Sequence, residues 1–267
     1  MKRHEFLRGL HRVSANRTYL EIGVNDGRSL ALSRVPSVAV DPAFKVVAEL
    51  RCDVHLARAT SDDFFARADP LGHLRGGRNP VRNLRRGRHP LGHWRRPVLD
   101  LAFIDGMHLF EYALRDFINI ERHTGWGSVV VLDDMLPRSA DEAARDRHTT
   151  AWTGDVYKLT GILARYRPDL VTVLVDTRPT GQLVVFGADR RSTVLADRYD
   201  EIVAEHLVPD PQKVPDAVVE RAAAVSPETL LGAGFWRPLV RARDRGLSRV
   251  RGWEPLRAAL AGFSSGR

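Results

Sequence analysis

The sequence contains a single cysteine, Cys52, among 267 residues, and aromatic side chains make up only 7% of it. One cysteine has no partner for an internal disulfide, and no cysteine and histidine cluster has the spacing of a zinc site. The chain also lacks a run of about 18 apolar residues and an N-terminal apolar stretch of signal-peptide length. We therefore expect a protein of the reducing cytoplasm with no membrane span.

Positive charge exceeds negative charge, with 41 lysines and arginines against 33 aspartates and glutamates and a formal net charge of +8. Much of the excess lies in 70–97, where three ten-residue units rich in proline, glycine and arginine follow one another. Units this short cannot bury a core, so we interpret 70–97 as a solvated insertion in a surface loop. The alternative is an arginine-rich arm that grips phosphates, because arginine forks match phosphate oxygens.

Apolar periodicity predicts an α/β fold. Residues 108–124 carry apolar side chains at helical spacing and predict a crossover helix between two strands. Thr153 is a candidate N-cap for a further helix, and the last two strands form an antiparallel closing pair. The expected strands are 18–24, 37–40, 98–104, 128–132, 171–175 and 182–186.

From residue 188 the sequence is mostly helical in pattern and is interrupted by prolines. We therefore expect a main domain over 1–187, which contains the insertion, and a helical C-terminal extension over 188–267 that serves as a cap or a dimerisation region. Near the end, Trp236 and Leu239 are followed by several arginines, which predicts a basic-faced amphipathic helix packed on the body.

A glycine motif, Glu21-Ile-Gly23-Val-Asn-Asp-Gly27, follows the first strand and is expected to precede a helix. Both glycines let the backbone approach a ligand closely. The motif lacks the G-x-G-x-x-G spacing that a dinucleotide pyrophosphate needs. It is more typical of a site for S-adenosylmethionine, in which Glu21 faces the cationic amino acid end.

Polar residues at the next strand ends complete a nucleoside site. Asp41 ends the second strand and can accept hydrogen bonds from both ribose hydroxyls. Ser61 and Asp62 follow the third strand and can accept from an adenine amino group. Each alone is also explained as a turn or helix cap, but their order after successive strands favours a ligand site.

Three aspartates lie at the carboxyl ends of predicted buried strands: Asp105, Asp133 and Asp134. They should converge at the edge of the sheet where the nucleoside site is expected. Asp105 is also expected to face the cofactor. Clustered carboxylates repel one another unless a cation neutralises them. Oxygen ligands suit Mg²⁺, with Mn²⁺ or Ca²⁺ as alternatives, better than zinc. The sequence therefore predicts a metal site; the structural alternative is that these residues cap the following loop and helix.

His108 follows Asp105 by three residues and should lie near the same crevice, where a neutral imidazole can accept a substrate proton. A hydrogen bond to local backbone is the alternative. Four residues further along the sequence have two interpretations. They either form the wall of the site for the methyl acceptor or make ordinary packing contacts at the start of a helix: Trp152, Asp155, Tyr157 and Lys158.

With Phe103-Ile-Asp-Gly-Met-His108 and Leu132-Asp-Asp134 in this order, the sequence resembles class I S-adenosylmethionine-dependent methyltransferases. It is most similar to the metal-dependent sugar O-methyltransferases of the macrocin and aminocoumarin pathways, over about 18–187. The resemblance implies a Rossmann-like seven-stranded, mostly parallel sheet with a reversed last strand. The residues it implies are Glu21, Gly23, Gly27, Asp41 and Asp62 for the cofactor, and Asp105, Asp133 and Asp134 for the metal.

One position departs from that family, whose sugar enzymes tend to carry an acid where this sequence has Met107. His108 is therefore the expected substitute base.

We expect methyl transfer from S-adenosylmethionine to a hydroxyl of a small molecule, such as a sugar, glycolipid or polyketide-like metabolite, assisted by Mg²⁺. The alternatives are a metal-independent small-molecule N-methyltransferase, and an RNA-associated methyltransferase or basic nucleic-acid-binding protein. The C-terminal extension is compatible with a homodimer.

Overall fold

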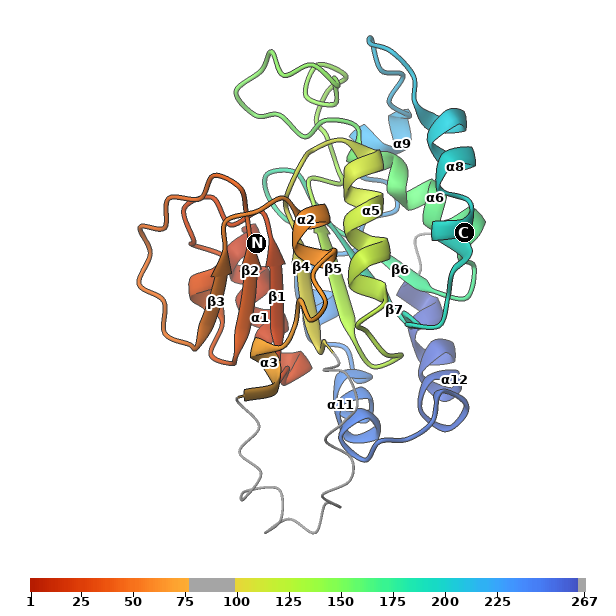
Figure 1. Ribbon diagram of the computed structural model, residues 1–267. Coiled ribbons are helices and arrows are strands. Elements are labelled where there is room, and N and C mark those ends of the chain that lie inside the picture. Colours follow the sequence, from red (N-terminus) through yellow and green to blue (C-terminus); the bar gives the residue numbers. More distant parts are fainter. Residues whose placement is uncertain (77–98, 264–267) are drawn as a thin grey trace.

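The computed structural model describes residues 1–76 and 99–263, and its centre is a seven-stranded sheet of order β3-β2-β1-β4-β5-β7-β6 (Figure 1). The strands are β1 (Tyr19–Ile22), β2 (Ser37–Val40), β3 (Val54–Ala57), β4 (Leu101–Ile104), β5 (Val129–Asp133), β6 (Val171–Val175) and β7 (Gln182–Phe186). Only β7 runs against its neighbours, pairing antiparallel with both β5 and β6. The expected mostly parallel Rossmann-like sheet with a reversed last strand is confirmed.

One face of the sheet is covered by the helix that follows β4. This helix, α5 (Phe110–Glu121), lies in front of the central strands in Figure 1 and buries Phe110, Leu114 and Phe117. It confirms the expected crossover helix within 108–124. The other helical segments with side chains in the same core are α2 (Ser61–Phe65), α3 (His73–Gly76), η3 (Val156–Lys158), α6 (Leu159–Tyr166), α7 (Val194–Asp197), α8 (Tyr199–His206) and α9 (Asp216–Val219).

The other face is covered by the first helix, α1 (Arg3–Ser14), together with C-terminal helices. Phe6 of α1 belongs to the same buried cluster as Trp236 and Leu239. The sheet is therefore apolar on both sides, which explains the continuous apolar strands. The C-terminal elements are α10 (Pro227–Leu231), α11 (Trp236–Asp244), α12 (Arg249–Leu260) and η4 (Ala261–Phe263).

Two local expectations are wrong. The glycine motif is followed only by a 3₁₀ turn, η1 (Leu30–Leu32), because Ser33 bonds locally to backbone and Pro36 restricts the residue before it. Thr153 does not cap a helix. Its hydroxyl donates to the carbonyl of Glu142 at 2.9 Å, and the left-handed Gly154 (φ +57°) separates it from the first helical residues.

The first unit of the basic repeat differs from the expected solvated insertion. Leu71 and Leu74 are each only 1% exposed and belong to the same buried cluster as the apolar side chains of α5. The side chains of 75–98, and with them the arginine-rich part of the 70–97 prediction, lie outside the described residues. Within the described ranges, no helix is both long and apolar enough to cross a membrane.

Candidate functional site

The carboxyl ends of the central parallel strands open into a cavity of about 780 Å³. This is the edge at which open α/β sheets bind ligands. The structure brings most of the site residues expected from the sequence to its wall. Those that line the cavity are Gly23, Asp41, Ser61, Asp62, Asp105, His108 and Asp134.

The loop after β1 lies close against the neighbouring strand end. Gly23 has φ +85°, and a Cβ atom there would lie 1.8 Å from the carbonyl oxygen of Asp105. The carboxylate of Asp41 accepts hydrogen bonds from the backbone N–H groups of Val24 and Asn25, each at 2.8 Å. Only glycine fits at position 23, and Asp41 holds the loop backbone at the cavity wall.

Glu21 and Gly27 do not line this cavity. Glu21 is fully buried and accepts hydrogen bonds from Tyr19 Oη at 2.6 Å and from Ser29 Oγ at 2.7 Å. Burial raises the pKa of Glu21 to about 7, although these two hydrogen bonds oppose the shift. A Cβ at Gly27 would meet Val46. Both residues therefore support the loop from the side that faces away from the cavity.

Ser61 and Asp62 each have a protein partner. Ser61 Oγ donates to Asp116, and the carboxylate of Asp62 pairs with Arg115 at 3.0 Å. Asp116 and Arg115 also line the cavity. Burial raises the pKa of Asp116 to about 7. Asp116 was not predicted from the sequence, because it lies in the middle of α5, where a carboxylate gives no local signal.

Replacing Asp116 by asparagine should make stability less dependent on pH. Between about pH 4 and pH 7, the Asp116 carboxyl is protonated in the folded protein but ionised in the unfolded chain. The free energy of unfolding of the wild type therefore falls as the pH rises through this range. The wild type should lose about 3 kcal/mol more than Asp116→Asn between pH 5 and pH 8. Urea unfolding at both pH values measures this, with exposed Asp200→Asn as control; parallel curves for wild type and Asp116→Asn contradict the assignment.

The ends of β4 and β5 bring together a cluster of possible metal ligands. One ligand atom each from Asp105, His108 and Asp134 lies within 4.8 Å of the others. His108 Nδ1 is 3.1 Å from Asp134 Oδ2, and Nε2 is 3.7 Å from Asp105 Oδ1. Burial lowers the pKa of His108, which favours a neutral ring.

Arg3 reaches the same cluster from α1. Its Nη1 lies 3.1 Å from Asp105 Oδ2 and also contacts Asp133 Oδ2. Backbone hydrogen bonds hold the segment in place, from Arg3 N to Arg178 O at 3.1 Å and from Arg178 N to Met1 O at 3.0 Å. Nothing in the sequence pattern indicated this pairing, because Arg3 is 102 residues from Asp105.

Asp133 therefore faces Arg3, whereas Asp134 faces the cavity and accepts from Thr180 Oγ1. Three carboxylates and one guanidinium leave a net charge of about −2 if all are ionised. Burial, and then repulsion from Asp133, raises the pKa of Asp134 to about 7. Asp133 Oδ1 is buried without a hydrogen-bond partner. A further cation bound here would offset the charge of the ionised carboxylates and lower the raised pKa of Asp134, so the cluster fits one.

Trp152 forms a wall of the cavity beside His108. The two rings stack with centroids 5.0 Å apart and planes 9° from parallel. His108 Nδ1 also lies 3.0 Å from the carbonyl oxygen of Trp152, so a proton on Nδ1 has an acceptor and Nε2 is left with its lone pair. The ring can therefore accept a proton or bind a cation through Nε2.

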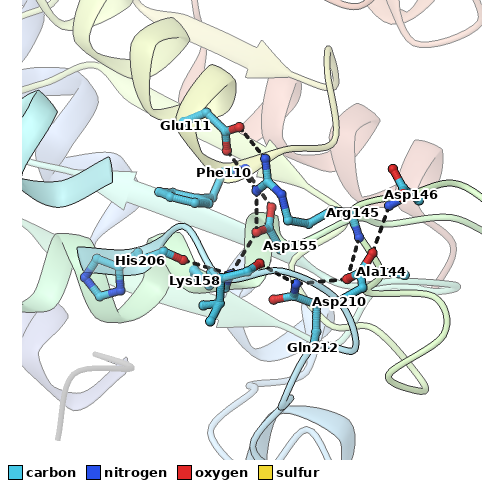
Figure 2. A network of polar contacts seen from close by, with 12 residues as sticks. Phe110, Glu111, Ala144, Arg145, Asp146, Asp155, Lys158, His206, Asp210 and Gln212 are labelled. Carbon is cyan, nitrogen blue, oxygen red and sulfur yellow. Dashed lines mark hydrogen bonds and ion pairs between the residues drawn. The ribbon is translucent and has the colours of Figure 1, made fainter. Parts of the chain in front are cut away.

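Asp155 and Lys158 do not line the cavity but belong to a largely buried network of polar contacts (Figure 2). Asp155 accepts hydrogen bonds from Phe110 N at 3.0 Å and from Arg145 and Lys158 at 2.8 Å each. Arg145 also pairs with Glu111 on α5 at 2.5 Å. The network fixes both ends of the loop that carries Trp152. Of the four residues considered for an acceptor wall, only Trp152 lines the cavity.

Comparison with known proteins gives similarity to solved structures only. No protein-family model matches the sequence, and no curated protein matches it. A candidate O-methyltransferase from Klebsiella pneumoniae is 15% identical over 69% of this chain and 79% of that chain, with a TM-score of 0.46. The O-methyltransferase TomG from Streptomyces achromogenes, in complex with SAM, is 17% identical over 69% and 79%, with a TM-score of 0.40. The methyltransferase MycE of the mycinamycin pathway, in complex with Mg and SAH, is 17% identical over 70% of this chain and 50% of that chain, with a TM-score of 0.41.

Proposed function

We propose that this protein transfers the methyl group of S-adenosylmethionine to a hydroxyl of a small molecule, such as a sugar, a glycolipid or a polyketide-like metabolite, in the cytoplasm. The observation that carries the proposal is a single cavity lined by two sets of residues. Gly23, Asp41 and Asp62 form one set along the first strand ends, and Asp105, His108 and Asp134 form the other. A nucleoside cofactor and a hydroxylated acceptor can therefore meet in this cavity.

In this proposal the cofactor lies along the ends of β1 and β2. Gly23 lets its backbone approach the ligand, and Asp41 accepts hydrogen bonds from the ribose hydroxyls with the acceptor capacity that its backbone contacts leave. Ser61 and Asp62 lie beside the adenine. Glu21 and Gly27 act indirectly, because Glu21 positions the loop through Ser29 and Gly27 lies behind it.

A divalent ion would be held by Asp105, His108 and Asp134, and when bound it would polarise the acceptor hydroxyl. The carboxylate of Asp133 is already paired with Arg3, so we do not include Asp133 among the proposed metal ligands. An imidazole whose Nε2 binds an ion has no lone pair left for a proton. The role of His108 as a base, predicted from the sequence, therefore belongs to the metal-free form of the reaction.

That metal-free form is the second candidate, and Arg3 favours it. The guanidinium already supplies one positive charge between Asp105 and Asp133. In this form the S–CH₃ bond of the cofactor breaks as the new O–CH₃ bond forms. The hydroxyl proton passes to Nε2 of His108, and S-adenosylhomocysteine leaves.

Calorimetry separates the two forms. We expect micromolar binding of S-adenosylmethionine and S-adenosylhomocysteine to the wild type, and binding of Mg²⁺ or Mn²⁺ that is lost in Asp134→Asn and His108→Gln but kept in Asp200→Asn. If His108→Gln still binds the ion but no longer methylates an acceptor that the wild type methylates, His108 acts as the base. Absence of cofactor binding in the wild type would overturn the proposed function altogether.

A further inference from the structure

A second hollow, of about 740 Å³, lies between α1 and the segment 28–35. It shares no lining residue with the cavity at the strand ends. We call it the basic groove. Its lining residues are His4, Arg8, His11, Arg12, Asn16, Arg28, Ala31, Leu32, Arg34, Val35 and Ala48. Four of these are arginines and none is acidic.

One wall of the basic groove is the polar face of α1. His4, Arg8 and Arg12 follow one another at four-residue spacing and therefore share a face of the helix. The opposite face buries Phe6 and Leu10 in the core. Arg8 and Arg12 are exposed, and within the described part of the chain neither has a hydrogen bond or an ion pair. These two guanidiniums are free to meet a ligand.

The acidic residues nearest in sequence are engaged elsewhere. Glu5 accepts from Lys2 N at 2.9 Å, and Glu49 pairs with Arg51 at 2.8 Å. Asp26 lies 3.3 Å from Arg28 and offsets only that one charge. Arg34 on the far wall donates to backbone carbonyls, so its charge is not neutralised. The groove therefore keeps a net positive charge of about three.

The floor and the size of the groove limit the ligand. Leu32 and Val35 give it an apolar floor, and no phenylalanine, tyrosine or tryptophan lines it. Single-stranded nucleic acid usually needs aromatic rings on which its bases stack, which this groove does not provide. Its volume is that of a pocket for a small molecule.

We propose that the basic groove binds a phosphorylated small molecule through a diphosphate or a pair of neighbouring phosphates. Guanidinium forks from Arg8 and Arg12 on one wall and Arg34 on the other would hold the phosphate oxygens by charge-assisted hydrogen bonds. The apolar floor accommodates a short carbon group attached to the phosphate. The proposal does not depend on methyl transfer, because the two cavities share no lining residue.

Inorganic pyrophosphate is the probe, titrated by calorimetry into the full chain at low and at physiological salt. We expect the double variant Arg8→Gln with Arg12→Gln to bind it about 30-fold more weakly than the wild type. The matched control is Arg237→Gln with Arg245→Gln, which removes the same charge from exposed positions on another helix and its C-cap. Circular dichroism melting checks that both double variants fold.

Two results would overturn the proposal. One is an equal loss in the control variant, or no loss in either, since pyrophosphate would then respond only to overall charge or bind elsewhere. The other is tighter binding of a single-stranded RNA oligonucleotide than of pyrophosphate, weakened by the same Arg8 and Arg12 changes. That result would assign the groove to nucleic acid instead.

Discussion

Replacing Arg3 by methionine is expected to lower the free energy of unfolding by about 2 kcal/mol when no divalent ion is present. Removing one partner of a buried ion pair leaves the other charge without compensation, which costs about 3–5 kcal/mol at fully buried sites. Arg3 is 33% exposed whereas Asp133 is 1% exposed, so we expect a somewhat smaller cost. Urea unfolding at neutral pH measures the difference.

The same variant should respond more strongly to divalent ions than the wild type. Without Arg3, the carboxylates of Asp105 and Asp133 face each other with no counter-charge, and a bound ion stabilises the folded state by mass action. Thermal melting with increasing Mg²⁺ or Mn²⁺ should therefore raise the Tm of Arg3→Met further than that of the wild type. Arg8→Met, an exposed arginine of the same helix, is the control. If the two variants lose equal stability, Arg3 does not act through the acidic cluster.

Replacing Gly23 by alanine is expected to weaken the binding of S-adenosylmethionine by at least about 100-fold. The added Cβ would lie 1.8 Å from the carbonyl oxygen of Asp105, and φ +85° is itself unfavourable for alanine by about 1–2 kcal/mol. The loop after β1 must move away from β4, and this displaces the Val24 and Asn25 amides that Asp41 holds. Both the cofactor contacts and the Asp105 side chain should shift.

Calorimetry with S-adenosylhomocysteine measures the loss, and circular dichroism shows whether the variant folds. Gly161→Ala is the matched control, because a Cβ there meets nothing within 4 Å and alanine favours the helix α6. It should bind as the wild type does and be slightly more stable. Unchanged affinity in a folded Gly23→Ala protein would mean that the cofactor does not use this loop.

Much of the fold was predictable because the relevant signals are local. The continuous apolar runs at β4 and β5 come from burial on both faces, and the helical spacing of Leu114 and Phe117 comes from packing on the sheet. The helix expected after Gly27 was not formed, since local hydrogen bonds of Ser33 and the restriction before Pro36 oppose it. Such competing preferences differ by too little free energy to be judged from sequence.

The candidate site was predictable to the extent that it follows strand ends. Asp105 and Asp134 directly follow buried residues of neighbouring parallel strands, whose carboxyl ends must meet at one edge. The direction in which each side chain points was not predictable. Asp133 and Asp134 are adjacent in sequence, yet Asp133 pairs with Arg3 and Asp134 faces the cavity.

By itself the sequence determined the α/β class, the reversed closing strand and the edge of the sheet at which glycines and carboxylates gather, since each depends on periodicity or on residues next to a strand end. Only the tertiary structure decided that Arg3 enters the acidic cluster, that Glu21 is buried behind the loop and that α1 presents free arginines to a groove. These features depend on contacts between distant segments. Which side chains meet is set by how the helices pack on the sheet, and no local sequence pattern encodes that packing.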